Sequence, residues 1–236
     1  MEENHPLLQI IDVSKSFPGV KALDKVNMTL MAGEVHALVG ENGAGKSTLV
    51  NLLLRYWDYE EGHILLNGKD LHCFAQDEVR AQISLVPQQV YLFNMSVRDN
   101  ILIAHPQASE EDMFKAARLA GIHDFILSLP EGYETWVGEL GARLSAGERQ
   151  RIALARALIR PAGLFILDEG TVNLDALNER HALESIFKAT AGRSLLMITH
   201  RLAGMEAMDE ILVMDQGVAV ARGNHAELLA AGGLYA

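Results

Sequence analysis

Cysteine, basic residues and long apolar runs are scarce in this chain of 236 residues. The single cysteine, Cys73, excludes an intrachain disulfide and a zinc site built on cysteines, and it is compatible with a reducing compartment. Lysine and arginine number 20 against 31 aspartates and glutamates, so the formal net charge is −11. Such an excess of negative charge repels phosphate backbones unless basic residues are concentrated locally. We therefore expect no nucleic-acid partner.

No stretch of the sequence approaches the roughly 20 apolar residues that are needed to cross a bilayer. The first residues, Met1-Glu-Glu-Asn-His5, lack the basic and apolar regions of a signal peptide. Hydrophobic residues make up 49% and charged residues 22% of the chain, and these ordinary values exclude a disordered protein. We expect a cytoplasmic globular domain, to which any membrane function would come through another polypeptide or an omitted part of the natural protein.

The spacing of apolar residues predicts strands that alternate with helices. Between residues 7 and 39, apolar runs of period two are separated by Pro18-Gly19 and Ala32-Gly33, which is typical of strands joined by turns. One helix is expected from Lys46, and another follows the capping box that begins at Ser109. Later elements are expected over residues 148–160, 164–167, 176–189 and 195–198, with a hairpin near 215–217. This alternation predicts a parallel sheet.

Gly40 begins a motif, G-x-x-x-x-G-K-[ST], that lies between a predicted strand and a predicted helix. Its glycines allow backbone N–H groups to converge on phosphate oxygens, and the helix N-terminus adds positive potential. Lys46 would reach the β and γ phosphates, and the Ser47 hydroxyl would bind Mg²⁺. We call residues 40–48 the phosphate loop. Its expected nucleotide contacts are Gly40, Asn42, Gly43, Ala44, Gly45, Lys46, Ser47 and Thr48.

Two carboxylates, Asp168 and Glu169, end the short apolar strand predicted over 164–167. The carboxyl edge of a parallel sheet is where ligands bind, so we expect Asp168 to hold Mg²⁺. Glu169 would polarise the attacking water as general base. Two acids after a strand are otherwise common as a helix cap, and the presence of the phosphate loop favours the catalytic interpretation.

The sequence Leu144-Ser145-Ala146-Gly147-Glu148 closely resembles the signature of ATP-binding cassette (ABC) proteins, and it precedes the Asp168 strand as that family requires. Ser145 and the adjacent N–H groups would head a helix, which is an anion site that can cap the γ-phosphate held by a second subunit. The resemblance implies that Ser145, Ala146, Gly147 and Glu148 contact ATP. The simpler alternative is a serine that only caps a helix.

Further positions match the family pattern and take their expected functions from it. Phe17 matches the aromatic residue that stacks on adenine, although a lone aromatic is more often part of a core. Gln88 resembles the glutamine that contacts Mg²⁺ and the attacking water and communicates with the membrane partner. Asn173-Leu174-Asp175 resembles the loop that reaches across the dimer, and Asp175 could also cap the next helix. His200 resembles the histidine that contacts the γ-phosphate.

Two positions depart from the family pattern. Ala146 stands where the signature usually has glycine, and its Cβ would crowd the approach of backbone to phosphate, so activity could be reduced. Gly170 follows Glu169 where the family usually has proline, which removes a restraint on φ. We expect the second effect to be smaller.

The resemblance implies one ABC ATPase domain over residues 1–236, with a RecA-like α/β core of the P-loop NTPase class. An antiparallel β subdomain is expected at the N-terminus and a helical subdomain is expected as an insert. The expected ranges are 7–32 and 60–72 for the β subdomain, 33–86 and 155–236 for the core, and 89–153 for the helical subdomain.

The two parts of the chain resemble different branches of the family. Residues 10–48 are similar to the first cassette of bacterial monosaccharide importers. From about residue 64 onward the chain is similar to exporter cassettes, such as that of the cysteine/glutathione exporter of cytochrome bd assembly, and the segment around Val137-Gly138-Glu139 resembles the loop that senses intracellular coupling helices. We hypothesise either a chimera joined near residues 48–64 or a divergent natural exporter cassette.

The predicted function is a transporter motor in which two cassettes close head to tail around ATP and Mg²⁺ and hydrolysis releases them. A homodimer or heterodimer would be peripheral to the inner membrane when assembled with a transmembrane domain. One alternative is a soluble ABC ATPase of DNA repair or translation, which the acidic charge and the short helical insert disfavour. The other is a domain that binds ATP but is impaired in hydrolysis, through Ala146 or a mismatched junction. The transported substrate is not specified by these residues.

Overall fold

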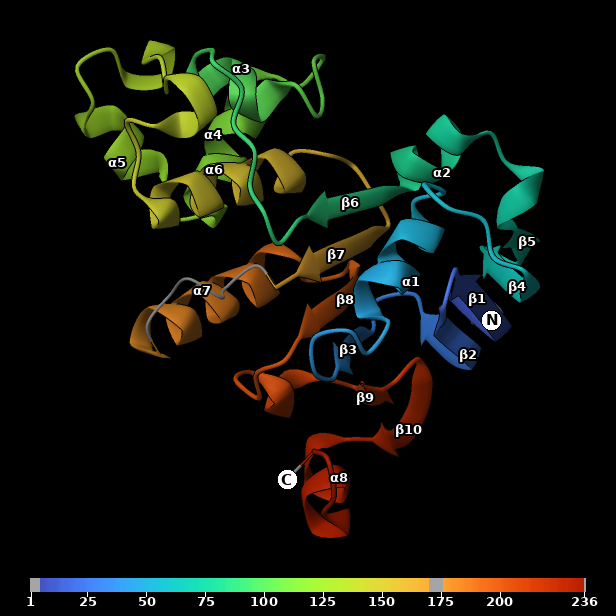
Figure 1. The fold of residues 1–236 in the computed structure, drawn as a ribbon. Helices are drawn as coiled ribbons and strands as arrows, with labels where there is room; N and C mark the ends of the chain where they lie inside the picture. Colours follow the sequence, from blue (N-terminus) through green and yellow to red (C-terminus); the bar gives the residue numbers. More distant parts are fainter. Residues whose placement is uncertain (1–4, 170–175, 236) are drawn as a thin grey trace. The chain divides into compact units, whose positions relative to one another are not determined.

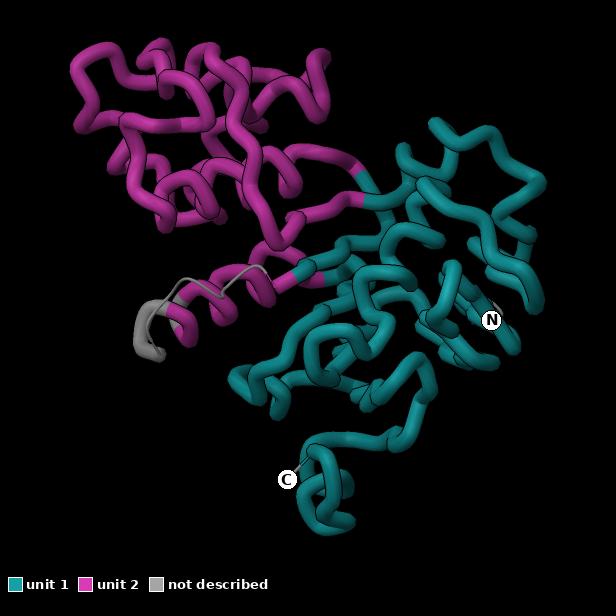
Figure 2. The backbone as a smooth tube through the Cα atoms, viewed as in Figure 1, with its two compact units in different colours: residues 1–83, 162–168, 192–236 teal, residues 84–161, 169–191 magenta. Residues whose placement is uncertain are grey.

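The computed structural model describes residues 5–169 and 176–235, and the chain divides into two compact units (Figures 1 and 2). Unit 1 comprises residues 1–83, 162–168 and 192–236, and unit 2 comprises residues 84–161 and 169–191. The mixture of helices and sheets confirms the predicted α/β class.

The first sheet of unit 1 is antiparallel and has the order β2-β1-β4-β5. Its strands are β1 (Pro6–Phe17), β2 (Val20–Met31), β4 (Glu61–Leu66) and β5 (Lys69–Asp70). The apolar residues at alternate positions are buried, as period two requires when one face of a sheet packs on a core. The antiparallel strands expected near the N-terminus are therefore present.

The second sheet of unit 1 contains strands in the order β10-β9-β3-β8-β7. These are β3 (Val35–Val39), β7 (Leu164–Asp168), β8 (Ser194–Thr199), β9 (Glu210–Asp215) and β10 (Val218–Gly223). The β3 strand is parallel to β8 and β9, and β7 is parallel to β8, whereas β10 is antiparallel to β9. A further strand, β6 (Ile83–Val86), begins at the last residue of this segment of unit 1 and continues into unit 2.

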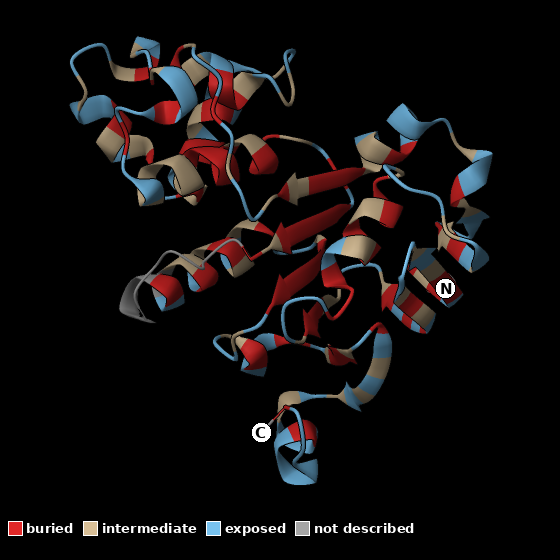
Figure 3. Ribbon diagram, in the orientation of Figure 1, coloured by how far each residue is buried: buried red, intermediate tan, exposed pale blue. Residues whose placement is uncertain are grey.

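The central strands of this sheet form the core of unit 1 (Figure 3). Every residue of β8 is buried, and so are the first four residues of β7. Continuous apolar runs of this kind are typical of parallel strands covered on both faces. The β9–β10 turn has Gln216 and Gly217 at φ 46° and 83°, as a tight two-residue hairpin requires, which confirms the predicted hairpin.

Helices of unit 1 flank these sheets. They are α1 (Lys46–Leu53), α2 (Gln76–Gln82) and α8 (His225–Ala231), with short 3-10 turns η1 (Leu71–Cys73) and η4 (Met205–Ala207). The α1 helix contacts β2, and α8 contacts β10.

Unit 2 is mainly helical. It contains α3 (Val97–Leu102), α4 (Glu110–Leu119), α5 (His123–Ser128), α6 (Ala146–Leu158) and α7 (Ala176–Ala189), with 3-10 turns η2 (Gly132–Glu134) and η3 (Glu139–Gly141). The α6 helix contacts both α3 and α4, and α7 contacts α4. Ser109 caps α4 with Asp112 as predicted, while α6 begins two residues earlier than expected because Ser145 caps it. None of the helices in the described residues is long and apolar enough to cross a membrane.

A polar cluster around Asp70 stabilises the edge of the first sheet. The Asp70 carboxylate accepts hydrogen bonds from the His72 backbone N–H at 2.9 Å and the Tyr59 hydroxyl at 3.2 Å, and it lies 3.0 Å from the His63 ring. Burial alone raises the pKa of this carboxyl, but the hydrogen bonds from His72, His63 and Tyr59 outweigh burial and lower the pKa to about 2. The cluster therefore favours a charged Asp70 in the folded state.

We predict that Asp70→Asn lowers the free energy of unfolding at pH 7 by on the order of 1–2 kcal/mol. Because the folded pKa lies below the ordinary value of 3.8, this stabilisation is complete above that value and is lost as the pH falls toward 2. Urea unfolding between pH 7 and pH 3 measures it, and the difference between wild type and variant should shrink below about pH 4. Asp77→Asn is the control, since that side chain is 99% exposed. A difference between wild type and Asp70→Asn that does not vary with pH would contradict the prediction.

Candidate nucleotide-binding site

The phosphate loop follows β3 directly and leads into α1. Gly43 and Gly45 have φ values of 88° and 98°, in the left-handed region that glycine occupies readily. The Lys46 side chain is buried, and its ammonium donates hydrogen bonds to the carbonyls of Gly40 and Glu41, the latter at 2.8 Å. The loop thus curls around a positive charge at the N-terminus of a helix, which is an anion-binding arrangement.

Two glycines of the loop are needed because the backbone comes close to neighbouring strands. A Cβ on Gly40 would lie 2.3 Å from the Met214 carbonyl oxygen of β9, and one on Gly45 would lie 2.5 Å from the Ala22 carbonyl oxygen of β2. These distances are far below van der Waals contact, so only glycine fits without movement of the backbone. The Gly217 N–H donates to the Ala44 carbonyl at 3.2 Å and connects the loop to the β9–β10 turn.

Parallel pairing places Asp168 and His200 at the same sheet edge as the phosphate loop. Val39 pairs with Thr199, and Asp168 pairs with Ile198, so the carboxyl ends of β3, β8 and β7 are aligned. Neighbouring strands are about 4.8 Å apart, and β8 lies between the other two. His200, which is exposed, follows the middle strand, and Asp168 ends the outer one half-buried. Unit 1 therefore gathers these predicted residues at the edge where ligands bind.

Phe17 lies half-buried at the end of β1 within an aromatic group that sequence reasoning did not find. Its ring is 4.9 Å from that of Trp57 in an edge-on arrangement, and the Lys15 ammonium lies 5.3 Å from its centre. Trp57 is 42% exposed, so the pair is a surface platform and not part of the core. The sequence did contain a signal for Trp57. It is a large aromatic residue in the polar stretch after α1, where no periodic pattern of apolar residues accounts for it.

Unit 2 brings Gln88 and Glu169 together. The Gln88 amide nitrogen donates a hydrogen bond to a Glu169 carboxylate oxygen at 2.5 Å. Glu169 is only 8% exposed and has a φ of 47°, a left-handed conformation that a side chain rarely adopts. Strained residues of this kind gather at functional sites, where the surroundings hold a side chain in one orientation. The hydrogen bond fixes the carboxylate that the sequence predicts as general base.

Ser145 caps α6, the helix that carries the signature. The Glu148 backbone N–H donates to the Ser145 hydroxyl at 3.3 Å, and the Ser145 N–H donates to the Glu148 carboxylate at 2.8 Å. The capping alternative is therefore real, but Ser145 and Ala146 are also exposed and available to a ligand. Asp175 and Gly170 lie outside the described residues, so the expectations on them are not addressed by the structure.

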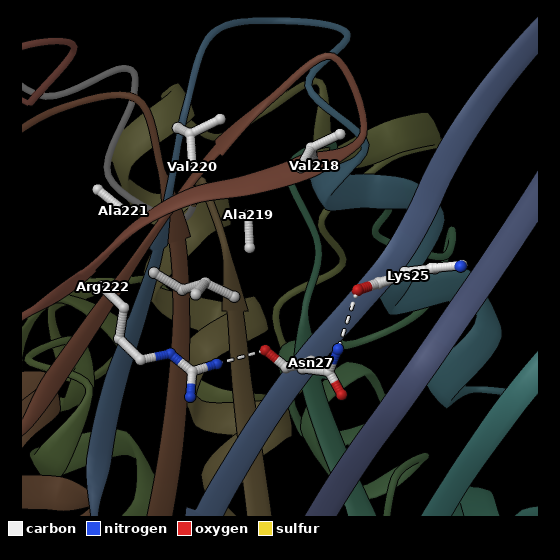
Figure 4. A pocket seen from close by; sticks show the side chains of 8 residues that line it. Lys25, Asn27, Val218, Ala219, Val220, Ala221 and Arg222 are labelled. Atoms are coloured by element: carbon white, nitrogen blue, oxygen red, sulfur yellow. Dashed lines mark hydrogen bonds between the residues drawn. The ribbon is translucent and has the colours of Figure 1, made fainter.

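A pocket of about 390 Å³ lies between β2 and β10, away from these groups (Figure 4). The Arg222 guanidinium donates to the Asn27 carbonyl, and the Asn27 amide donates to the Lys25 carbonyl at 3.0 Å. Among the described residues its lining contains none of those predicted to bind nucleotide. The pocket is therefore not part of the predicted nucleotide site.

Comparison with known proteins identifies the family. The ABC transporter family matches residues 23–172. The ATP-dependent lipid A-core flippase of Syntrophus aciditrophicus (strain SB) is 44% identical over 228 residues, which are 97% of this chain and 38% of the flippase. ATP-binding cassette sub-family B member 6 of Homo sapiens is 44% identical over 218 residues, 92% of this chain and 26% of that protein. The solved structure of a bacterial Atm1-family ABC exporter with ATP bound covers all of this chain and 41% of its own, with a TM-score of 0.92 and 38% identity.

The chain belongs to the ABC transporter family. It is the nucleotide-binding domain of that family, an ATP-binding and ATP-hydrolysing motor domain, and its fold is that of the exporter cassette. It spans less than half the length of these relatives. The flippase alignment covers 97% of the chain and so includes the proposed junction, while the hypothesis of a chimera stays a prediction.

We predict that Gly45→Ala destabilises the protein more than Gly19→Ala. Both glycines have positive φ, so each alanine pays about 1–3 kcal/mol of backbone strain. A Cβ at Gly45 also meets a backbone carbonyl at 2.5 Å, whereas a Cβ at Gly19 meets nothing within 4 Å. Thermal unfolding and ATP titration compare the two variants. Equal unfolding temperatures would show that the close approach to β2 is unimportant.

Proposed function

We propose that this domain hydrolyses Mg²⁺-ATP as a head-to-tail dimer of cassettes and so drives export by a transmembrane domain. The observation that supports this proposal best is the hydrogen bond from Gln88 to the buried Glu169 carboxylate, because it prepares a general base. Such a group serves hydrolysis and is not needed for ATP binding alone. The relatives named as a flippase and an exporter support the direction of transport.

Nucleotide binding is assigned to unit 1. The exposed face of Phe17 would stack on adenine, with Trp57 supporting the ring from its edge. Backbone N–H groups of the phosphate loop, together with Lys46 at the N-terminus of α1, would hold the phosphates. His200 would contact the γ-phosphate and stabilise the charge that develops on it.

Ser47, Asp168 and Gln88 each carry an oxygen donor of the kind that Mg²⁺ prefers, and this ion is usually held by one or two carboxylates together with substrate phosphates and waters. The Ser47 hydroxyl is exposed on the first turn of α1. The Gln88 nitrogen already donates to Glu169, so its amide oxygen is the atom left for a cation. When bound, the ion neutralises phosphate charge and orients the γ-phosphoryl group. Glu169 would accept a proton from the attacking water.

A second cassette would complete each site. Ser145, Ala146, Gly147 and Glu148 form the start of α6 and would approach the γ-phosphate held by the partner, and Asp175 would reach across the same interface. Ala146 is exposed at the first position of the helix, so its methyl group disturbs no packing within this chain. Reduced activity would therefore arise only in the dimer. The hydrolysis-impaired alternative is not favoured by the relatives.

The transmembrane partner would dock on unit 2, at the cytoplasmic side of the inner membrane. Tyr91 and Phe93 lie a few residues after Gln88, with ring centres 5.0 Å apart, and they are 54% and 38% exposed. Trp136 is 53% exposed beside Val137-Gly138-Glu139, the segment that resembles a coupling loop. Exposed aromatics are enriched where proteins associate. We also propose the three subdomains that the sequence predicts. The β subdomain covers residues 7–32 and 60–72, the RecA-like core covers 33–86 and 155–236, and the helical subdomain covers 89–153.

The experiment is Mg²⁺-ATP hydrolysis across a range of protein concentrations, with Glu169→Gln as the catalytic variant. The rate should rise faster than linearly, because the composite site needs two chains. Loss of the general base should lower kcat by about 10²-fold or more while ATP still binds. Glu131→Gln, on the exposed surface of unit 2, is the matched control. ATP binding without hydrolysis in the wild type would instead support the impaired alternative, and a strictly linear rate would contradict dimerisation.

A further inference from the structure

The segment that carries Gln88 is fixed at both ends to the last turn of α6. On one side of Gln88, the buried Ser84 hydroxyl donates to the Ala157 carbonyl at 2.6 Å. On the other side, the Arg156 guanidinium donates to the Tyr91 carbonyl at 2.8 Å. Ser84 and Tyr91 are far apart in sequence from α6, yet their partners are consecutive residues. We call residues 84–91 the Gln88 loop. Both of its ends are hydrogen-bonded to adjacent residues in the last turn of α6, the helix that carries the signature.

Arg156 makes more contacts than a single hydrogen bond. Its Nε donates to the Asn100 carbonyl at 2.7 Å and its Nη2 donates to the Asn100 side-chain oxygen at 2.8 Å. The guanidinium also lies 5.7 Å from the centre of the Phe93 ring. Burial lowers the pKa of Arg156, as expected for a cation removed from water without a carboxylate partner among these contacts. A planar group with several fixed donors is needed to satisfy these acceptors at once.

Asn100 extends this arrangement to the backbone of Phe93. It is fully buried, and its amide donates to the Phe93 and Ser96 carbonyls at 2.9 and 3.0 Å. Its side-chain oxygen accepts from the Phe93 N–H at 2.9 Å as well as from Arg156. Both amide donors and both acceptor positions of Asn100 are therefore used. Such a fully satisfied buried group fixes a backbone in one register.

The consequence of this backbone register is visible in the side chains at the end of the Gln88 loop. Leu92 is fully buried, while Tyr91 and Phe93 on either side of it are exposed. A change of one residue in register would place either Tyr91 or Phe93 at the buried position of Leu92 and would expose Leu92. The hydrogen bonds of Arg156 and Asn100 therefore determine where the Gln88 loop ends.

We propose that Arg156 is a positioning residue for hydrolysis, which holds the Gln88 loop on the signature helix and so keeps the Gln88 amide on the Glu169 carboxylate. The inference rests on the proposed function. Arg156 acts through Gln88, and its hydrogen-bond partners, Tyr91 and Asn100, are not among the residues predicted to bind nucleotide. Because α6 is one continuous helix of 13 residues from Ala146 to Leu158, any movement of the signature would also move both anchors of the loop.

Arg156→Lys is the variant that tests this proposal, because lysine keeps the charge but cannot reach three acceptors in a plane. Its kcat should fall by about tenfold, while the KM for ATP changes by less than about twofold. A double-mutant cycle that combines Arg156→Lys with Gln88→Ala shows whether Arg156 affects kcat through Gln88. If Arg156 acts through Gln88, the double variant should have the kcat of Gln88→Ala alone. Losses that multiply, or an unchanged kcat in Arg156→Lys, would overturn the proposal.

Arg98→Lys is the matched control, since Arg98 lies in the same unit and makes 2.5 Å ion pairs with Glu110 and Glu134 away from the Gln88 loop. It should leave kcat within about twofold of wild type when both variants have comparable thermal stability. An equal loss in Arg98→Lys would mean that Arg156 only supports folding.

Hydrogen exchange tests the contact without turnover. The Phe93 N–H, which donates to Asn100, should exchange about fivefold or more faster in Arg156→Lys, while the Ala120 N–H of the α4 terminus is unchanged. Unchanged exchange at Phe93 overturns the proposal even if kcat falls. If the wild-type dimer hydrolyses no ATP, the proposed function fails, and hydrogen exchange still decides whether Arg156 holds the loop.

Discussion

The aligned register of three parallel strands is the constraint on which the nucleotide site depends. Because β3, β8 and β7 end together, the phosphate loop, His200 and Asp168 leave the sheet at one edge although they are far apart in the sequence. The side chains of β8 and of the first four residues of β7 are buried, so a shift of either strand would require the closely packed core around it to repack. The chemistry of the site is therefore an outcome of core packing in unit 1.

Close backbone approach adds a second requirement to that register. Gly40 packs closely against a carbonyl oxygen of β9, and Gly45 packs closely against a carbonyl oxygen of β2. The phosphate loop therefore contacts both sheets of unit 1. The Lys46 ammonium donates hydrogen bonds to two backbone carbonyls of the same loop. The two glycines, which the sequence predicts to bind phosphate, also allow the two sheets of unit 1 to approach the loop, so a substitution at either position would affect stability as well as the predicted binding.

In unit 2 the orientation of the Glu169 carboxylate, the proposed general base, depends on a chain of hydrogen bonds that begins outside the proposed site. Glu169 adopts a left-handed conformation and is held by Gln88. The Gln88 loop is in turn fixed to α6 by Ser84 and Arg156. A strained residue, a loop and the signature helix therefore form one connected set, which explains how a helix that bears the signature could influence hydrolysis.

The sequence by itself determined the fold class, the phosphate loop, the Asp168 strand and the signature, because local patterns encode them: strand, glycine loop and helix in order, or a serine followed three residues later by glutamate. The tertiary structure decided the rest. Trp57 beside Phe17 and Arg156 beside Tyr91 are contacts between residues distant in the chain, and neither residue stands in a local motif. Side-chain partners of this kind follow from the packing of whole elements, so no window of sequence specifies them.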